Sequence, residues 1–150
     1  MIEGQTVFLS AAKIAKAVTT GEITPTEVIH EYLDRIRRLN PLLNAYITVC
    51  EKEALRDARA LEILLRRKEN PGPLAGVPLA VKDQFSTRGI RTTNGSRIFQ
   101  NSIPNEDATV ISRLKNSGAL LLGKLNMSEL ALGGTRDPLG GIPRNPWDLE

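Results

Sequence analysis

The stretch GPLAGVPLAVKD, residues 72–83, decides the fold of this 150-residue chain. Within it Val77, Leu79 and Val81 alternate with other residues, which predicts a strand of about five or six residues. Lys82 stands at the end of this strand, whose other residues have the pattern of buried ones. Because a buried ammonium group must either find a partner or lose its proton, Lys82 is a candidate general base.

The residues after Lys82 predict a second strand, reached through a crossover helix. A polar loop at about 84–106 precedes a helix that Gly118 ends, and the apolar run ALLL at 119–122 follows. A strand, a crossover helix and a second strand form a βαβ unit, whose parallel strands are buried on both faces. Residues 123–126 are then expected to lead into another short helix.

Two lysines, Lys82 and Lys124, lie close to the carboxyl ends of the two predicted strands. Ligands of open parallel sheets bind outside these ends, so both lysines can face one cleft. The pattern alone favours the alternative, in which each lysine extends from a strand end into solvent.

The residues before this α/β region are predicted to form helices. A first helix is expected at about 11–19, and TPTE at 24–27 has the pattern of a capping box that begins a second helix. The dipeptide NP at 40–41 is expected to stop the second helix, and a third helix is expected at about 51–68.

The composition of the chain excludes several classes of function. The chain is 41% hydrophobic with a formal charge of +3, and its basic residues are scattered among 17 acidic ones, which argues against a nucleic-acid-binding patch. Aromatic residues make up only 4% of the chain, too few for the stacking platforms that bind single strands. We therefore expect no direct nucleic-acid partner.

The use of cysteine and histidine limits the chemistry further. Cys50 is the only cysteine, so neither an internal disulfide nor a zinc site is expected, and no metal or cofactor is predicted. With His30 as the only histidine, neither Ser/His nor Cys/His catalysis has support. The chain shows no signal peptide and no apolar run long enough to cross a bilayer, so we expect a cytoplasmic protein without a membrane partner.

Four segments together resemble the amidase signature family, in the order in which that family has them. They are GPLAGVPLAVKD at 72–83, DATV at 107–110, GALLLGKLNMSEL at 118–130 and RNPWD at 144–148. The segments GEITPTE at 21–27 and LNPLLNAY at 39–46 resemble the opening helices of the same family. Any one motif is weak, but the ordered set covers essentially the whole chain, so the resemblance is specific.

The resemblance implies an α/β fold in which N-terminal helices are followed by a βαβ unit of a mixed, largely parallel central sheet. Residues 1–150 would be the N-terminal portion of a single amidase domain, with front helices at 1–70 and the start of the sheet core at 71–150. Cut after two strands, such a sheet would have unpaired edges and exposed apolar faces at Val77, Leu79, Val81 and residues 120–122, so we expect the chain to aggregate or self-associate.

The resemblance also implies a serine hydrolase without a catalytic histidine. Family members cleave amide bonds with a lysine, a serine in a cis peptide and a nucleophilic serine, and by resemblance the lysine is Lys82. Neutral Lys82, its pKa lowered by burial, would accept a proton from the bridging serine, which takes one from the nucleophile. Lys124 is by the same resemblance a structural residue, and we expect Lys124→Arg to cost much less activity than Lys82→Arg. The stretch around Ala131, Gly133 and Gly134 resembles the lining of the acyl pocket, which implies a small-molecule amide substrate.

In the family both catalytic serines follow the RNPWD motif, so the 150 residues are expected to carry only the lysine and to be inactive alone. The first hypothesis is an amidase that hydrolyses a carboxamide to a carboxylate and ammonia. The second is the related amidotransferase subunit, which releases ammonia from glutamine for tRNA-dependent amidation. The third, of another class, is a non-catalytic truncated fragment. A homodimer and a complex with amidotransferase partner subunits are the alternative assemblies.

Overall fold

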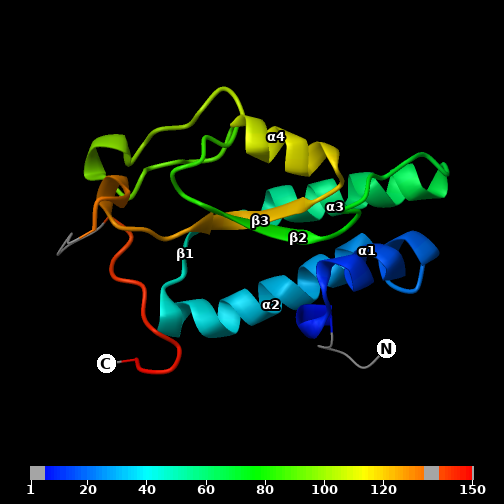
Figure 1. Ribbon diagram of the computed structural model, residues 1–150, viewed down its shortest axis with the longest axis horizontal. Helices are drawn as coiled ribbons and strands as arrows, with labels where there is room; N and C mark the ends of the chain where they lie inside the picture. The colour runs from blue at the N-terminus through cyan, green and yellow to red at the C-terminus, as the bar shows by residue number, and fades with distance from the viewer. Residues whose placement is uncertain (1–5, 134–138, 150) are drawn as a thin grey trace. The chain divides into compact units, whose positions relative to one another are not determined.

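The computed structural model describes residues 6–133 and 139–149 and shows an α/β chain, as predicted (Figure 1). Its helices are α1 (Ala11–Thr20), α2 (Pro25–Leu43), α3 (Glu51–Arg66) and α4 (Thr109–Asn116). Its strands are β1 (Tyr46–Val49), β2 (Pro78–Lys82) and β3 (Leu120–Leu125), and short 3-10 helices lie at Thr6–Phe8, Arg97–Phe99 and Glu129–Ala131. Within these described ranges, no helix has the length and apolar character needed to span a membrane.

The strands form one sheet in the order β1–β3–β2, with β3 in the centre (Figure 1). β1 runs antiparallel to β3, with Tyr46 opposite Leu125 and Val49 opposite Gly123. This pairing makes the sheet mixed, as predicted, although the sequence pattern does not predict β1 itself.

β2 and β3 are parallel neighbours. The amide of Leu120 donates to Val77 O at 2.9 Å, and the amide of Asp83 donates to Leu125 O at 3.0 Å, so the paired residue numbers rise together. The predicted βαβ unit, with α4 as its crossover helix, is confirmed. Of the apolar strand residues expected to be exposed, Val81 and residues 120–122 are buried, whereas Val77 and Leu79 are half-buried. The expected exposure is therefore wrong for the central strand β3, which is covered on both faces, and for Val81 of β2.

The chain divides into two compact units. The helical unit comprises residues 6–36, 51–79 and 113–122, and the loop unit comprises residues 37–50, 80–112, 123–133 and 139–149. A buried apolar cluster forms a core of the helical unit, made of Ile14, Ala17, Val18, Ile23, Val28 and Ala75. The predicted division into front helices at 1–70 and a sheet core at 71–150 stays a prediction.

Local signals in the sequence fix where the first two helices begin. The Ser10 side chain accepts a bond from Lys13 N ahead of α1. At the start of α2, Glu27 N donates to Thr24 Oγ1 at 3.1 Å and Thr24 N donates to Glu27 Oε2 at 2.8 Å. The predicted capping box is therefore confirmed.

The second helix does not stop at Asn40-Pro41 but continues to Leu43, so the expected end is wrong. A proline removes only one helical donor, and near the last turn that loss is small. The turn is closed by Asn44 N, which donates to Asn40 O at 2.7 Å. The Asn40 side chain also accepts from Tyr46 N at 2.7 Å, which joins the helix end to the start of β1.

β3 is longer than the apolar run at 119–122, and the short helix expected after residue 126 is the 3-10 helix Glu129–Ala131. The extension pairs with β1, whose backbone approaches closely at Gly123. A side chain there would place a Cβ 2.3 Å from Thr48 O. Because the extension depends on β1, the apolar run alone does not predict a strand that continues through Lys124.

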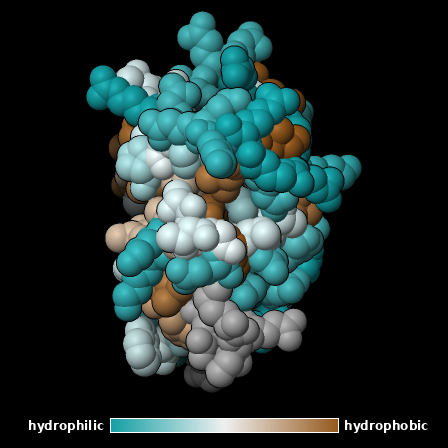
Figure 2. Space-filling model, turned by 90° about the vertical axis from the view of Figure 1, so that its right-hand side faces the viewer, coloured by the Kyte–Doolittle hydropathy of each residue, from teal (hydrophilic) through white to brown (hydrophobic). Residues whose placement is uncertain are grey.

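Apolar side chains remain exposed at other places on both units. Phe8 of the helical unit is 77% exposed, and Ile98, Leu132 and Trp147 of the loop unit are 82%, 83% and 94% exposed. On the face shown in Figure 2, apolar areas are separated by polar side chains. The expectation of self-association therefore rests on these residues and not on the strand faces.

Candidate active site

Lys82 is the last residue of β2 and is exposed, so the extension into solvent that the pattern favours is confirmed for Lys82. The burial that its role as a base implies is not observed among the described residues. Its neighbours Val81 and Asp83 are buried. Consecutive strand residues point to opposite sides, so the burial of Asp83 directs the Lys82 side chain outward. The site therefore presents an amine at the carboxyl end of a strand of a parallel pair, where ligands of such sheets bind.

Lys124 is fully buried, and the expectation that it extends into solvent is wrong. Its Nζ lies 3.5 Å from Oδ1 of Asp83, whose side chain is also fully buried. The ammonium completes its bonds to neutral acceptors, because Nζ donates to Phe85 O and to Thr92 Oγ1, both at 2.7 Å. The buried charge of Lys124 is thus compensated by an opposite charge and by hydrogen bonds, as burial requires. Lys82, by contrast, is exposed.

The other carboxylate oxygen of Asp83 holds the loop that follows β2. Asp83 Oδ2 accepts from Thr93 N at 2.8 Å and from Thr93 Oγ1 at 2.5 Å. The Asp83 main chain takes part as well, since its carbonyl accepts from Asn94 N at 3.2 Å. Among the described residues Asp83 Oδ1 has no hydrogen bond, so the ion pair with Lys124 is what compensates it.

The loop at 84–106 meets the segment after β3 at a tight turn. Asn94 and Gly95 have φ of 53° and 66°, and a Cβ on Gly95 would lie 2.7 Å from Met127 O. Ser96, directly after the turn, also contacts the segment that follows β3, because its Oγ donates to Glu129 Oε1 at 2.6 Å. The long polar loop that the sequence predicts is therefore an ordered part of the site.

The residues predicted to line an acyl pocket follow this contact. Ala131 and Gly133 are exposed and both have positive φ, 61° and 73°. Leu130, with φ of 51°, donates its amide to Asn94 O at 2.8 Å. The third predicted residue, Gly134, lies outside the described residues. A role of Ala131 and Gly133 in binding substrate stays a prediction.

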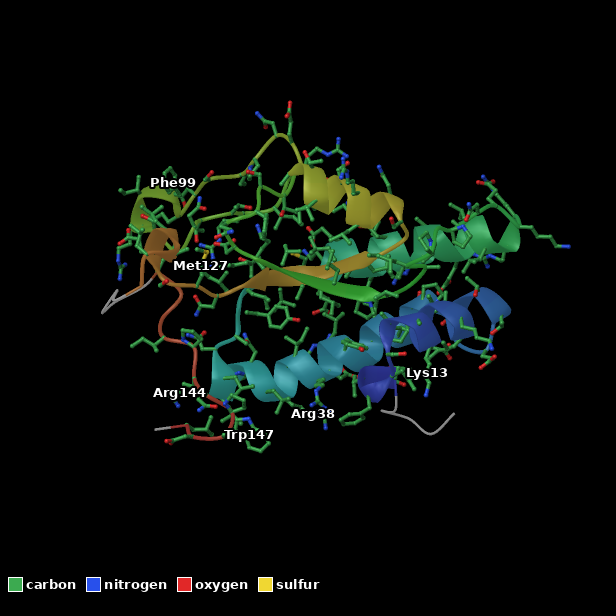
Figure 3. The ribbon with its side chains drawn as sticks, viewed as in Figure 1. Lys13, Arg38, Phe99, Met127, Arg144 and Trp147 are labelled. Carbon is green, nitrogen blue, oxygen red and sulfur yellow. The ribbon has the colours of Figure 1, made fainter. Side chains whose placement is uncertain are left out.

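The segment at 139–149 lies beside the end of α2 in the loop unit, where Figure 3 labels Arg144 and Trp147. The amide of Arg144 donates to Leu43 O at 2.7 Å. The Asn126 side chain holds the same region, since its Nδ2 donates to Asn44 O, Gly140 O and Gly141 O at 3.1, 3.2 and 3.0 Å.

Sequence reasoning missed the roles of Asp83, Thr92, Thr93 and Asn126. Asp83 had a signal, because an acidic residue directly after a candidate lysine base is one step from the site. The two threonines and Asn126 had none, since only the fold brings them to their partners. The described ranges contain no group of three side chains able to hold a metal ion, and Cys50 is buried and forms no disulfide.

Known proteins similar to this chain were found by sequence and by structure. The family model described as Amidase matches residues 27–150. A glutamyl-tRNA(Gln) amidotransferase subunit of Carboxydothermus hydrogenoformans is 46% identical over 144 residues, which are 95% of this chain and 30% of that protein.

Two solved structures show the same similarity. The native peptide amidase from Stenotrophomonas maltophilia matches with a TM-score of 0.88 and 32% identity, over 97% of this chain and 31% of that one. A bacterial aryl acylamidase of the amidase signature enzyme family matches with a TM-score of 0.87 and 33% identity, over 94% and 30% of the two chains. The chain thus spans about three tenths of the length of these proteins.

Proposed function

Because the chain belongs to the amidase signature family, we propose that the protein cleaves the C–N bond of a carboxamide and yields a carboxylate and ammonia. The observation that supports this best is the position of Lys82. It lies at the carboxyl end of β2, exposed, and directly before the buried Asp83. An amine held at this place can take part in proton transfer to groups that approach the end of the strand.

In the proposed mechanism neutral Lys82 accepts a proton from a bridging serine in a cis peptide, and that serine takes a proton from the nucleophilic serine. The nucleophile then attacks the amide carbon, the C–N bond breaks, and the proton held by Lys82 returns through the bridging serine to the nitrogen that leaves as ammonia. Water then adds to the acyl group, and the acid is released with the serine restored. The 150 residues supply only the lysine of this set.

A second candidate is an amidotransferase subunit that releases ammonia from glutamine for tRNA-dependent amidation. It is favoured by sequence identity, which is 46% to a relative named as a glutamyl-tRNA(Gln) amidotransferase subunit and 32–33% to the two amidases of known structure. In this case the protein would work with partner subunits, and glutamine would be its amide substrate. Both candidates place Lys82 in the same role.

Ammonia release tests the proposal and separates the candidates. The protein, in the full length that its gene encodes, should release ammonia from simple carboxamides or from glutamine, and Lys82→Ala should slow the release by about 10²–10⁴ or more. Activity with carboxamides in the absence of any partner favours the amidase. Activity with glutamine that requires amidotransferase partner subunits favours the second candidate, and no release under either condition would support a non-catalytic protein.

A further inference from the structure

Asp83 links Lys82 to the buried interior of the loop unit. The Asp83 amide donates to Leu125 O at 3.0 Å, its carbonyl accepts from Asn94 N, and its carboxylate accepts both donors of Thr93. Lys82 and Asp83 share a planar peptide group, so these contacts also fix the main chain of Lys82. Alternation along the strand then sets the direction in which the Lys82 side chain leaves.

Lys124 holds the same strand end from within the protein. Its Nζ lies 3.5 Å from Asp83 Oδ1, and it donates to Phe85 O and Thr92 Oγ1. Phe85 lies just after β2, and Thr92 lies just before Thr93, which binds Asp83 Oδ2. The Lys124 ammonium therefore connects the two ends of the segment 85–93, the first part of the loop at 84–106. Both charged side chains are fully buried, so water cannot replace the contacts if either is lost.

We propose that Lys124 is a positioning residue for Lys82, acting through Asp83 and the loop at 85–93. The inference rests on the proposed function, in which Lys82 accepts the proton. The role of Lys124 requires its buried charge and its contacts with Asp83, Phe85 and Thr92, and it involves no transfer of a proton by Lys124. Loss of these contacts should leave Lys82 at the end of β2, but its amine would be held less firmly in the orientation that proton transfer requires.

Three variants of the full-length protein test this. Lys124→Met removes the ammonium, and the paired variant Asp83→Asn with Lys124→Met removes both charges, so that it can fold where the single variant fails. Lys52→Met, at an exposed position on α3, is the matched control. Two properties are measured: amide hydrogen exchange by mass spectrometry in peptides that cover residues 83–96, and the kcat and KM of amide hydrolysis.

In the paired variant we expect amides within 83–96 to exchange at least about tenfold faster, while peptides of α3 are unchanged. We expect kcat to fall by about tenfold to hundredfold with KM within about threefold, because a displaced base slows the reaction and not substrate binding. The control should match the unaltered protein in both measurements.

Unchanged exchange within 83–96 would overturn the inference, whatever the activity. A stable paired variant with unaltered kcat would overturn it as well, since the pair would then serve stability alone. Failure of the proposed function has a different signature, because the unaltered protein would then release no ammonia. In that case hydrogen exchange alone decides whether Lys124 holds the strand end that carries Lys82.

Discussion

Two lysines with similar positions in the sequence have opposite surroundings in the fold. Lys124 lies in the central strand, opposite Thr48 of β1, and is fully buried, whereas Lys82 ends the edge strand β2 and is exposed. The short strand β1 accounts for part of this difference, because it pairs with β3 at Lys124 and makes β3 central. The buried lysine is therefore the one with a fixed charge partner, and the exposed one is open to groups that reach the strand end.

Burial of Lys124 predicts a large loss of stability when its charge is removed. Lys124→Met should lower the free energy of unfolding by about 3–5 kcal/mol, because it leaves Asp83 buried without an opposite charge. Urea unfolding followed by circular dichroism measures this, with Lys52→Met as a control that should change the value by less than about 0.5 kcal/mol. A loss below about 1 kcal/mol for Lys124→Met would show that the pair contributes little.

The same burial argues against the expectation that Lys124→Arg costs little activity. A guanidinium is larger than an ammonium and planar. To hydrogen-bond to Phe85 O and Thr92 Oγ1 it would have to push both residues out of their present positions. The resemblance identifies Lys124 as structural, but it carries no information on how little space surrounds the side chain.

At the scale of elements, the capping box of α2 makes a prediction that combines stability with pH. Hydrogen bonds from the backbone and side chain of Thr24 hold the pKa of Glu27 below its ordinary value of 4.5. A carboxyl whose pKa is lowered on folding stabilises the protein above its unfolded pKa, and this contribution disappears as the pH falls through the folded pKa. The stabilisation by Glu27 is therefore present at pH 7 and is lost on the acid side of about pH 4.5.

Thr24→Ala should cost about 1 kcal/mol at pH 7, because it removes the side chain that caps Glu27 N. The variant should lose less stability than the unaltered protein between pH 7 and about pH 3, since Glu27 keeps only part of its hydrogen bonding. Thermal unfolding at the two pH values measures both effects. If acid lowered the stability of Thr24→Ala as much as that of the unaltered protein, the hydrogen bond of the Thr24 side chain to the Glu27 carboxylate would have no role in the pKa of Glu27.

The close approach of β1 to β3 makes Gly123 a second element to test. Gly123→Ala should destabilise the protein by more than about 2 kcal/mol, because the added Cβ would lie 2.3 Å from Thr48 O and the two strands must separate. Gly21→Ala is the comparison. Gly21 has a φ of 75°, but a Cβ added there would meet no atom within 4 Å, so only backbone strain of about 1–2 kcal/mol is expected. Equal losses in the two variants would contradict the close approach.

These elements also show which parts of the fold a sequence can predict. The helices and the parallel pair are predictable because their signals are local: caps, an apolar period and a polar loop between two apolar runs. β1 was missed because its four residues carry little pattern of their own, and their partner strand is far away in the sequence. In the candidate site the sequence predicts Lys82 at a strand end but not which way it faces, because the side that a strand residue faces depends on the sheet around it. The resemblance adds Ala131, Gly133 and Gly134, whose role in binding substrate stays a prediction.

At the scale of the whole molecule, we predict that residues 1–150 alone have no amidase activity. The proposed mechanism needs two serines and an oxyanion-binding loop besides Lys82, and loss of even one member of such a set removes most of the rate. Ammonia release by the purified 150-residue chain, with glutamine and with simple carboxamides, measures this. Turnover that depends on the concentration of the chain would contradict the prediction and would require a nucleophile within these residues.

The central claim is that Lys82 accepts a proton, and the contrast between two substitutions in the full-length protein tests it most directly. Lys82→Ala should lower kcat by about 10²–10⁴ or more, and Lys82→Arg should lower it nearly as much, because a guanidinium keeps its proton at working pH. Lys52→Arg, at an exposed position on α3, should leave kcat unchanged. If Lys82→Arg kept most of the activity, Lys82 would act by its charge and not as the base.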